Sequence, residues 1–400
     1  MTIWLSAGLY CLLGSAPQPA AAEPTIDWYS LRSPGPAGHD IEQGSGLCFG
    51  SIGKRDGLWI VCDRNGGQSA GRIYRIGPQT LVAARRGEAL TADEEFVITP
   101  PREGWPAFRA AHPNLGDMAT NAEVLDHLQQ RVEAGLRGTD GPRLDLEAIT
   151  IGPGVGSPAE SHLFVVAEEP YSLVLELAIA DPEPIAGADM PNGPSQARLV
   201  ATYRYIEVEQ DRGADSNDGL EGIAYAGSPG RFWWVEEGTR LHKPDAHPRL
   251  FFAEPRLGLA RLLPGGSIQI DEISDRATHA VRSQRVGDAQ TLNALCRTRD
   301  GQLLAVDRNG GWIVQVDPKS VTATRWLNLY DLFGQNLREL LASFPGPRRM
   351  PYVSIEGLAV DGNADLWLLD DPAMPEAFRA SCLVRISGVY PPPTTDSRPQ

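Results

Sequence analysis

Acidic side chains recur at two fixed places of a motif that this sequence repeats. Each repeat begins with a short segment of the form S/E/N-G/A-Leu/Ile, and after a turn an apolar strand follows that ends on an acid. The five copies are SGLC (45–48) with WIVCD (59–63), EAIT (147–150) with FVVAE (164–168), EGIA (221–224) with FWWVE (232–236), NALC (293–296) with LLAVD (303–307), and EGLA (356–359) with LWLLD (366–370). Carboxylate and amide oxygens are the ligands that hard cations prefer. The repeat therefore indicates cation chemistry as well as repeated structure.

The two polar positions of each copy are expected to meet in space. In an antiparallel pair the start of the first strand lies beside the end of the second. This places Ser45 near Asp63, Glu147 near Glu168, Glu221 near Glu236, Asn293 near Asp307, and Glu356 near Asp370. If the first strand of each pair is the innermost one, all of these side chains gather at one mouth of a central channel.

Carboxylates gathered in this way repel one another, and a bound divalent cation cancels the repulsion. Oxygen ligands without histidine favour Ca²⁺ or Mg²⁺, and Ca²⁺ is the better candidate because many ligands at flexible geometry suit it. The candidate metal ligands are Asp63, Glu147, Glu168, Glu221, Glu236, Asn293, Asp307, Glu356 and Asp370. The approach loop 211–218 adds Asp215, Asn217 and Asp218. The alternative is that the strand-end acids cap turns and that the motif recurs through duplication alone.

The elements between these residues predict an all-β fold, a β-propeller. Residues equivalent to Ser45 are separated by 102, 74, 72 and 63 positions, and a four-stranded blade needs roughly 40–50 residues. The longest interval has room for an extra blade, so six blades are expected first and five next. Two short helical insertions are expected near 117–136 and 329–344. In the first, Leu125, Leu128, Val132 and Leu136 share a helical face, and Thr120 with Glu123 would form a capping box.

Composition fits one domain over residues 23–390, since 42 Gly and 33 Pro suit a chain with many tight turns. A net charge of −15 argues against a nucleic-acid partner. Residues 1–22 read as a signal peptide that ends on small residues, with no transmembrane segment, which predicts a periplasmic or extracellular monomer. Residues 391–400 are expected to be a disordered tail. Cys48 and Cys62 lie on the two strands of one hairpin and would bridge only if its register pairs them.

The motifs also resemble those of a known family. The pairs DLEAIT/LFVVAEEP, NDGLEGIAY/FWWVEEG, LNAL/LLAVDRNGG and SIEGLAVDGNADLWLLDDP are similar to those of the esterase-like-activity-of-phytase (phytase-like) family, and the related SdiA-regulated-like group is also similar. The resemblance covers roughly residues 42–390. It implies a propeller with acidic metal sites on one face and phosphoester hydrolysis. A dense basic pocket for a highly phosphorylated substrate is missing from the sequence, which argues against phytate itself.

In a metal-assisted hydrolysis the acids and arginines would have different roles. Glu147, Glu221 and Glu356 would hold the metal and activate water, while Arg64 and Arg308 would clamp an anion. Both arginines follow a strand-end acid in a DRNGG segment that occurs at 63–67 and 307–311. Two alternatives remain open. One is a non-catalytic, calcium-stabilised propeller that binds a protein, glycan or envelope partner, and the other is a lactonase-like hydrolase.

Overall fold

The structure is a computed structural model of the 400-residue chain. It describes residues 24–35, 37–64, 67–137, 141–168, 171–180, 194–205, 220–236, 240–241, 251–252, 256–271, 291–308, 310–317, 322–334, 354–371 and 380–389. The expected signal peptide 1–22, the approach loop 211–218, and the expected tail 391–400 lie outside the described residues.

The first two blades form one continuous eight-stranded sheet. Blade 1 consists of β2 (Gly44–Ile52), β3 (Arg55–Cys62), β4 (Arg72–Ile76) and β6 (Glu94–Thr99). Blade 2 consists of β7 (Leu146–Pro153), β8 (Ser161–Ala167), β9 (Leu173–Ala180) and β10 (Ser195–Arg204). Neighbours within each blade are antiparallel, and the two outermost strands, β6 and β10, pair in parallel. This pairing joins the blades at their outer edge.

The other three blades are separate sheets. Blade 3 consists of β11 (Leu220–Tyr225), β12 (Arg231–Glu236), β15 (Arg256–Leu262) and β16 (Ile268–Asp271). Blade 4 consists of β17 (Ala294–Arg297), β18 (Leu303–Asp307), β19 (Trp312–Asp317) and β20 (Thr322–Asn328). Blade 5 consists of β21 (Ile355–Val360), β22 (Leu366–Asp370), β23 (Cys382–Ser387) and β1 (Thr25–Arg32), with β5 (Ala89–Thr91) alongside β1. The pair β13 (Arg240–Leu241) and β14 (Phe251–Phe252) stands apart.

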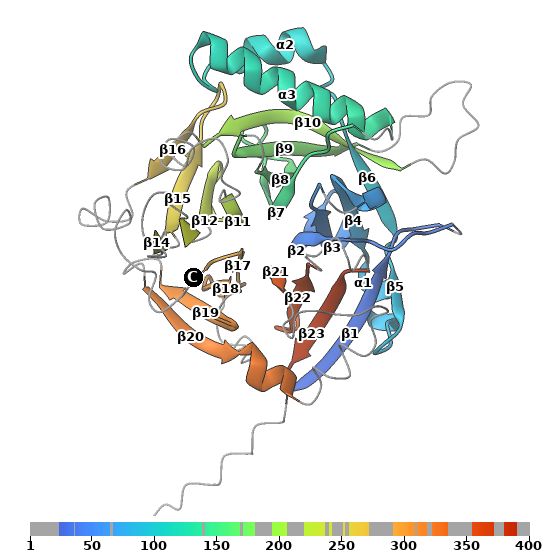
Figure 1. The fold of residues 1–400 in the computed structure, drawn as a ribbon. Coiled ribbons are helices and arrows are strands. Elements are labelled where there is room, and N and C mark those ends of the chain that lie inside the picture. The colour runs from blue at the N-terminus through green and yellow to red at the C-terminus, as the bar shows by residue number, and fades with distance from the viewer. Residues whose placement is uncertain are drawn as a thin grey trace, which may run out of the picture.

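The five inner strands close a ring. Strand β2 contacts β7, β7 contacts β11, β11 contacts β17, β17 contacts β21, and β21 contacts β2, and Figure 1 shows these strands around the centre. The fold is therefore a β-propeller, and the described part of the chain forms five blades, which was the second of the two expected counts. The longest interval between repeats holds two helices and an outer strand instead of an extra blade.

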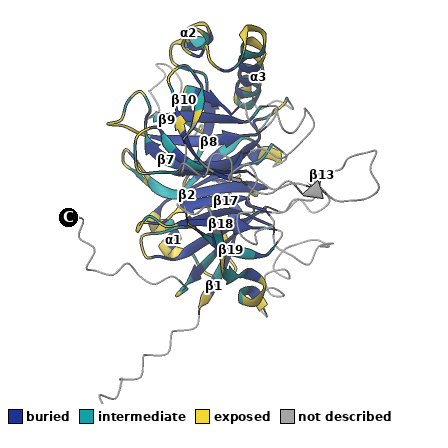
Figure 2. Ribbon diagram, turned by 90° about the vertical axis from the view of Figure 1, so that its left-hand side faces the viewer, coloured by how far each residue is buried: buried dark blue, intermediate teal, exposed yellow. Residues whose placement is uncertain are grey.

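The hydrophobic core is divided into five clusters of buried residues, one at each junction between neighbouring blades. Blades 1 and 2 share Trp59 and Val165, for example, and blades 2 and 3 share Phe164 and Phe232. The other clusters join blades 3 and 4, 4 and 5, and 5 and 1. Figure 2 shows the blade strands largely buried and the exposed residues mostly on turns and helices. Packing between blades thus holds the inner strands in place.

The helical insertion between blades 1 and 2 is larger than expected. Helices α2 (Gly104–Ala111) and α3 (Met118–Arg137) lie outside blade 2 (Figure 1), and buried Val124 and Leu128 of α3 belong to the same core cluster as Phe96 of β6. The expected Thr120–Glu123 capping box is not what caps α3. Instead, Asp117 accepts a hydrogen bond from the Thr120 N–H at 2.9 Å, which is the ordinary N-cap contact.

Shorter helical elements complete the described chain. Helix α1 (Pro78–Ala83) and the 3₁₀ turn η1 (Gly67–Ser69) lie in blade 1. Of the second expected insertion, residues 329–334 are helical, and 335–344 lie outside the described residues. No helix in the described ranges is long and apolar enough to cross a membrane.

The hairpin register keeps Cys48 and Cys62 apart. Cys48 faces Trp59 and Cys62 faces Gly44, and both thiols are free. No disulfide joins them.

Candidate functional site

In four of the five repeats the first polar residue lies at a β-bulge. Ser45, Glu147, Glu221 and Glu356 are each the extra residue at which the register between the first and second strand shifts by one. In blade 4, the Asn293 N–H donates to the carbonyl of Val306, the residue that already faces Ala294. A bulge turns a side chain out of its normal alternation, and bulges are frequent beside active sites. The same irregularity therefore recurs in the inner strands of blades 1, 2, 3 and 5, and Asn293 takes the equivalent place in blade 4.

The strand-end acids divide into two classes that the sequence motif treats as one. Glu236 faces Leu220 and Asp370 faces Ile355 across their hairpins, whereas Cys62 and Ala167 occupy that place in blades 1 and 2. Asp63 and Glu168 therefore lie one residue later than Glu236 and Asp370. Because successive side chains of a strand alternate in direction, this step decides which way the carboxylate points.

Asp371, which the sequence motif omitted, is the blade 5 counterpart of Asp63 and Glu168. The N–H groups of Asp63, Glu168 and Asp371 make the same backbone contact, to the carbonyls of Gln43, Asp145 and Ser354 at 2.9, 3.0 and 2.8 Å. Each acceptor lies two residues before the bulge residue. The sequence has two consecutive aspartates, Asp370 and Asp371. Only the strand register shows that Asp371 is the one equivalent to Asp63 and Glu168.

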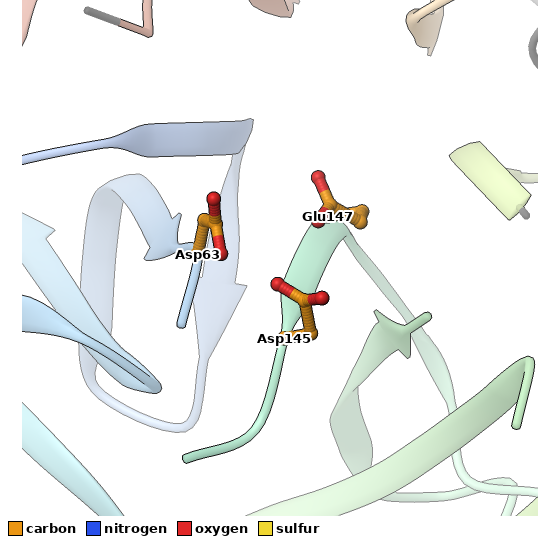
Figure 3. A group of neighbouring side chains, drawn as sticks. All are labelled: Asp63, Asp145 and Glu147. Atoms are coloured by element: carbon orange, nitrogen blue, oxygen red, sulfur yellow. The ribbon is translucent and has the colours of Figure 1, made fainter. Parts of the chain in front are cut away.

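Three carboxylates meet where blades 1 and 2 join. Asp63, Asp145 and Glu147 each offer an oxygen atom such that all three atoms lie within 4.8 Å of one another. Figure 3 shows Asp63 after the end of β3, facing Asp145 and Glu147 at the start of β7. Asp145 is 1% exposed and was not among the predicted ligands, although it stands two residues before Glu147 in DLEAIT. The cluster brings together two predicted ligands and one new residue.

Burial and like charge act together on this cluster. Burial, then the hydrogen bond and charge of Asp63, raise the pKa of Asp145 to about 8, although Arg64 opposes the shift. Burial also raises the pKa of Glu147 well above its usual range, with Glu221 the largest charge contribution, followed by Asp145, Glu168 and Asp63. Carboxylates of blades 1, 2 and 3 are therefore close enough to repel one another, and the site favours either a proton or a cation.

The opposite side of the mouth carries an arginine side chain. The Arg308 guanidinium donates a hydrogen bond to Glu356 Oε1. Burial and the charges of Glu356, Asp63 and Asp370 raise the pKa of Asp371, and Arg308 lowers it. On the side of the three-carboxylate cluster, the Arg64 guanidinium lies 3.4 Å from Asp145 Oδ2. The Arg64 backbone N–H also donates a hydrogen bond to Asp145 Oδ1 at 3.3 Å. Both predicted arginines thus lie at the mouth, each beside a carboxylate.

The two DRNGG segments are not structurally equivalent. Val61 faces Gly46 in blade 1 and Val306 faces the corresponding Ala294 in blade 4. Asp307 therefore corresponds to Cys62, and Arg308 corresponds to Asp63. The two DRNGG segments are therefore offset by one residue in the structure. Blade 4 carries an arginine, Arg308, at the position where blades 1, 2 and 5 carry an acid.

Two of the predicted ligands make structural contacts. Glu236 accepts a hydrogen bond from the Tyr205 hydroxyl at 3.0 Å. Asp307 Oδ1 accepts the N–H groups of Thr291 and Gly310 at 3.1 and 2.9 Å. These contacts match the turn-capping alternative. The buried residues Glu168, Asn293 and Asp370 also lie at this end of their hairpins, while Ser45 Oγ bonds the Gln43 carbonyl at 3.4 Å.

Several buried oxygen atoms at this end accept no hydrogen bond from any described residue. They are Gln43 Oε1, Asp307 Oδ2 and Asp371 Oδ1, and their residues are at most 6% exposed. Buried oxygen atoms without a donor are costly, and a cation is one species that satisfies them. The three-carboxylate cluster itself supplies oxygen ligands of the kind that suit a hard cation.

Most of the chain matches one known protein family. Residues 42–372 match the Phytase-like family, described as esterase-like activity of phytase. The chain belongs to this family. No curated protein matches the sequence, so the phytase-like assignment rests on the family match across most of the chain.

Solved structures resemble this phytase-like chain only distantly. The PQQ-bound aldose sugar dehydrogenase from Streptomyces coelicolor is 10% identical, with 92% of this chain and 100% of that chain covered and a TM-score of 0.38. Virginiamycin B lyase from Staphylococcus aureus is 9% identical, with 91% and 99% covered and a TM-score of 0.32. A GH43 glycoside hydrolase is 10% identical, with 93% and 55% covered and a TM-score of 0.42.

Proposed function

We propose that this protein is an exported, calcium-dependent hydrolase of phosphate or carboxylic esters, with its site at the acidic mouth of the propeller. The observation that carries the proposal is the pairing of the Asp63–Asp145–Glu147 cluster with Arg64 at its edge. Arg308 lies on the far side of the same mouth, at Glu356. An acidic cation site flanked by guanidinium groups suits an anionic ester or the anionic state that forms during its hydrolysis.

Asp63, Asp145 and Glu147 would hold the cation, with Glu168, Glu221 and Asp371 supplying negative charge around them. Calcium is preferred over magnesium because the donors come from several loops and strands, and calcium accepts such irregular oxygen sets. When bound, the cation would offset charge on the substrate oxygens and lower the pKa of a coordinated water.

The residues of the chain have separate parts in this proposal. Arg64 is 30% exposed in its side chain and Arg308 is 24% exposed, so both reach solvent while the acids beneath them are buried. A guanidinium donates two parallel hydrogen bonds to a carboxylate or phosphate. Two such groups suit one anionic group better than a highly phosphorylated substrate, which argues for simple esters over phytate. Export is supported by the signal-like residues 1–22, and we expect a monomer.

The first experiment measures metal binding and turnover in the same preparation. Metal content of the purified protein is determined, and calcium and magnesium are titrated calorimetrically after chelation. Turnover is followed with nitrophenyl phosphate, bis-nitrophenyl phosphate, nitrophenyl acetate and a simple lactone. Asp145→Asn should abolish calcium binding and turnover while circular dichroism stays unchanged. Asp56→Asn is the matched control, because Asp56 lies at the far turn of the β2–β3 hairpin and bonds Ser51.

The outcomes separate the alternatives. Calcium-dependent turnover that Asp145→Asn removes and Asp56→Asn preserves supports the hydrolase. Calcium binding without turnover on the whole panel overturns the hydrolase and leaves a metal-stabilised binding protein. A protein that binds neither calcium nor magnesium overturns both. Glu221→Gln and Glu356→Gln then test whether blades 3 and 5 contribute to the site.

A further inference from the structure

A cavity lies between the inner strands, away from the acidic mouth. Its volume is about 180 Å³, and its lining comes from all five inner strands. The lining residues follow the bulge residues by two to four positions, which is about 7–13 Å along a strand. None of them belongs to the acidic cluster. The volume is that of roughly six water molecules, so the cavity accommodates a small organic molecule.

The lining residues differ in size according to their position in the strand. The third residue after each bulge residue is Cys48, Thr150, Ala224, Cys296 or Ala359. The fourth residue forms an outer ring of larger side chains, namely Phe49, Ile151, Tyr225, Arg297 and Val360. The five outer residues divide by chemistry: neighbouring blades 3 and 4 supply Tyr225 and Arg297, and blades 5, 1 and 2 supply the three apolar side chains. The cavity therefore has a polar side and an apolar side.

The charge of the cavity is opposite to that of the mouth. Its described lining contains no Asp or Glu, and its one charged side chain is Arg297, in a chain of net charge −15. The two thiols add no negative charge, because burial raises the pKa of Cys48 well above its usual range and that of Cys296 to about 12. An isolated positive charge above an apolar wall complements an amphiphilic anion.

Arg297 and Tyr225 line the cavity at the same level of two neighbouring inner strands. Burial raises the pKa of Tyr225, and the Arg297 charge opposes that shift. The Arg297 guanidinium also lies beside Gly227 and Gly301, where an added Cβ would be 3.3 Å from its nitrogen atoms. In the part of the chain that the structure describes, no carboxylate forms an ion pair with Arg297, and its charge remains available to a ligand.

We propose that this cavity binds a small aliphatic monocarboxylate, with its carboxylate at Arg297 and the Tyr225 hydroxyl and its alkyl chain against Phe49, Ile151 and Val360. The site is separate from the proposed hydrolytic mouth and does not depend on it. A carboxylate bonded to a guanidinium and a hydroxyl gains more than an uncharged group of the same size. The alkyl chain fills space that would otherwise hold poorly bonded water.

Calorimetric titration with hexanoate tests the proposal, with hexan-1-ol and acetate as probes that lack the charge or the chain. Hexanoate should bind saturably, and each control probe should bind about tenfold more weakly or worse. All titrations are done in chelator, so that a carboxylate at a metal in the mouth does not contribute. Asp145→Asn should leave hexanoate binding unchanged.

Variants locate the binding. Arg297→Gln should weaken hexanoate binding about tenfold or more and leave hexan-1-ol unaffected, and Tyr225→Phe should give a smaller loss. Arg299→Gln is the matched control, since Arg299 is exposed two residues further along and does not line the cavity. Any of three results would overturn the proposal: no saturable binding of hexanoate, equal binding of hexanoate and hexan-1-ol, or undiminished hexanoate binding in Arg297→Gln. The cavity would then hold only water.

Discussion

Gly46→Ala is the sharpest test of how the inner strands are packed. Gly46 follows the bulge residue Ser45 in β2, and an added Cβ would lie 2.6 Å from Ala148 Cα and 2.8 Å from the Glu147 carbonyl oxygen of β7. Both atoms belong to backbone, so no side-chain rotation relieves the contact. The neighbouring blades must separate.

The size of the effect follows from these distances. Ordinary contacts of a Cβ begin at 3.4 Å, so the strands must move by about 0.8 Å, and overpacking of this kind costs about 1–3 kcal/mol. We expect the upper end of that range for Gly46→Ala. Gly50→Ala should cost less, because its Cβ would meet the terminal Cδ1 of Ile151 at 2.9 Å. Gly156→Ala has open space around it and should cost nothing.

Urea unfolding followed by tryptophan fluorescence measures all three variants. The order of destabilisation should be Gly46→Ala, then Gly50→Ala, then Gly156→Ala. If calcium binds as proposed, Gly46→Ala should also weaken it, because the substitution moves β7 away from the strand that precedes Asp63. A Gly46→Ala protein as stable as Gly156→Ala would refute the inferred contact between blades 1 and 2.

Two further predictions concern other buried groups. Glu176 is 1% exposed and accepts hydrogen bonds from His162 at 2.7 Å, Tyr203 at 2.6 Å and the Val155 N–H at 3.0 Å. Glu176→Gln should therefore lower the free energy of unfolding by about 3–5 kcal/mol at a pH where His162 is charged. Burial alone would lower the pKa of His162, but the hydrogen bond and charge of Glu176, with Glu160, raise it overall. The stabilisation is complete below the ordinary histidine pKa of about 6.5 and is lost as pH rises through the raised pKa of His162. The difference in the free energy of unfolding between wild type and variant should therefore shrink from about pH 6 to about pH 9. A difference in urea unfolding that stays constant over this range would contradict a charged imidazole. The thiols of Cys48, Cys62, Cys296 and Cys382 are free, so dithiothreitol should leave the melting temperature unchanged, and a fall on reduction would reveal a disulfide.

The repeated motif predicted the inner strands because it couples a polar residue to an apolar strand at a fixed spacing. Its first residue is at a bulge in four blades and at the equivalent place in the fifth. The blade count was harder, since the interval before Glu147 is long for reasons unrelated to blades: it contains α2 and α3. Interval length does not separate a strand from an insertion.

The second half of the motif was predicted only to within one residue. Register is a property of two strands, and the bulge that sets it leaves no mark in the sequence of either strand alone. Asp371 was therefore passed over for Asp370, and Arg308 was equated with Arg64 although it corresponds to Asp63. Asp145 was missed for a related reason: it precedes its strand, and its contacts with Glu168 and Arg64 at the mouth leave no mark in the sequence.

The closing of blade 5 by β1 has a consequence for how the molecule assembles. Thr25 pairs with Ser387 and Ser30 with Cys382, so the ring joins the two ends of the described chain. Contacts between residues so distant in sequence form slowly, because the loop-closure entropy must be overcome first. Blades 1 and 2, which hold Asp63, Asp145 and Glu147, are complete by Arg204, whereas blade 5 needs β23, which ends at Ser387. We therefore expect the acidic cluster to exist before the ring is sealed, with Glu356 and Asp371 joining it in the last and slowest step of folding.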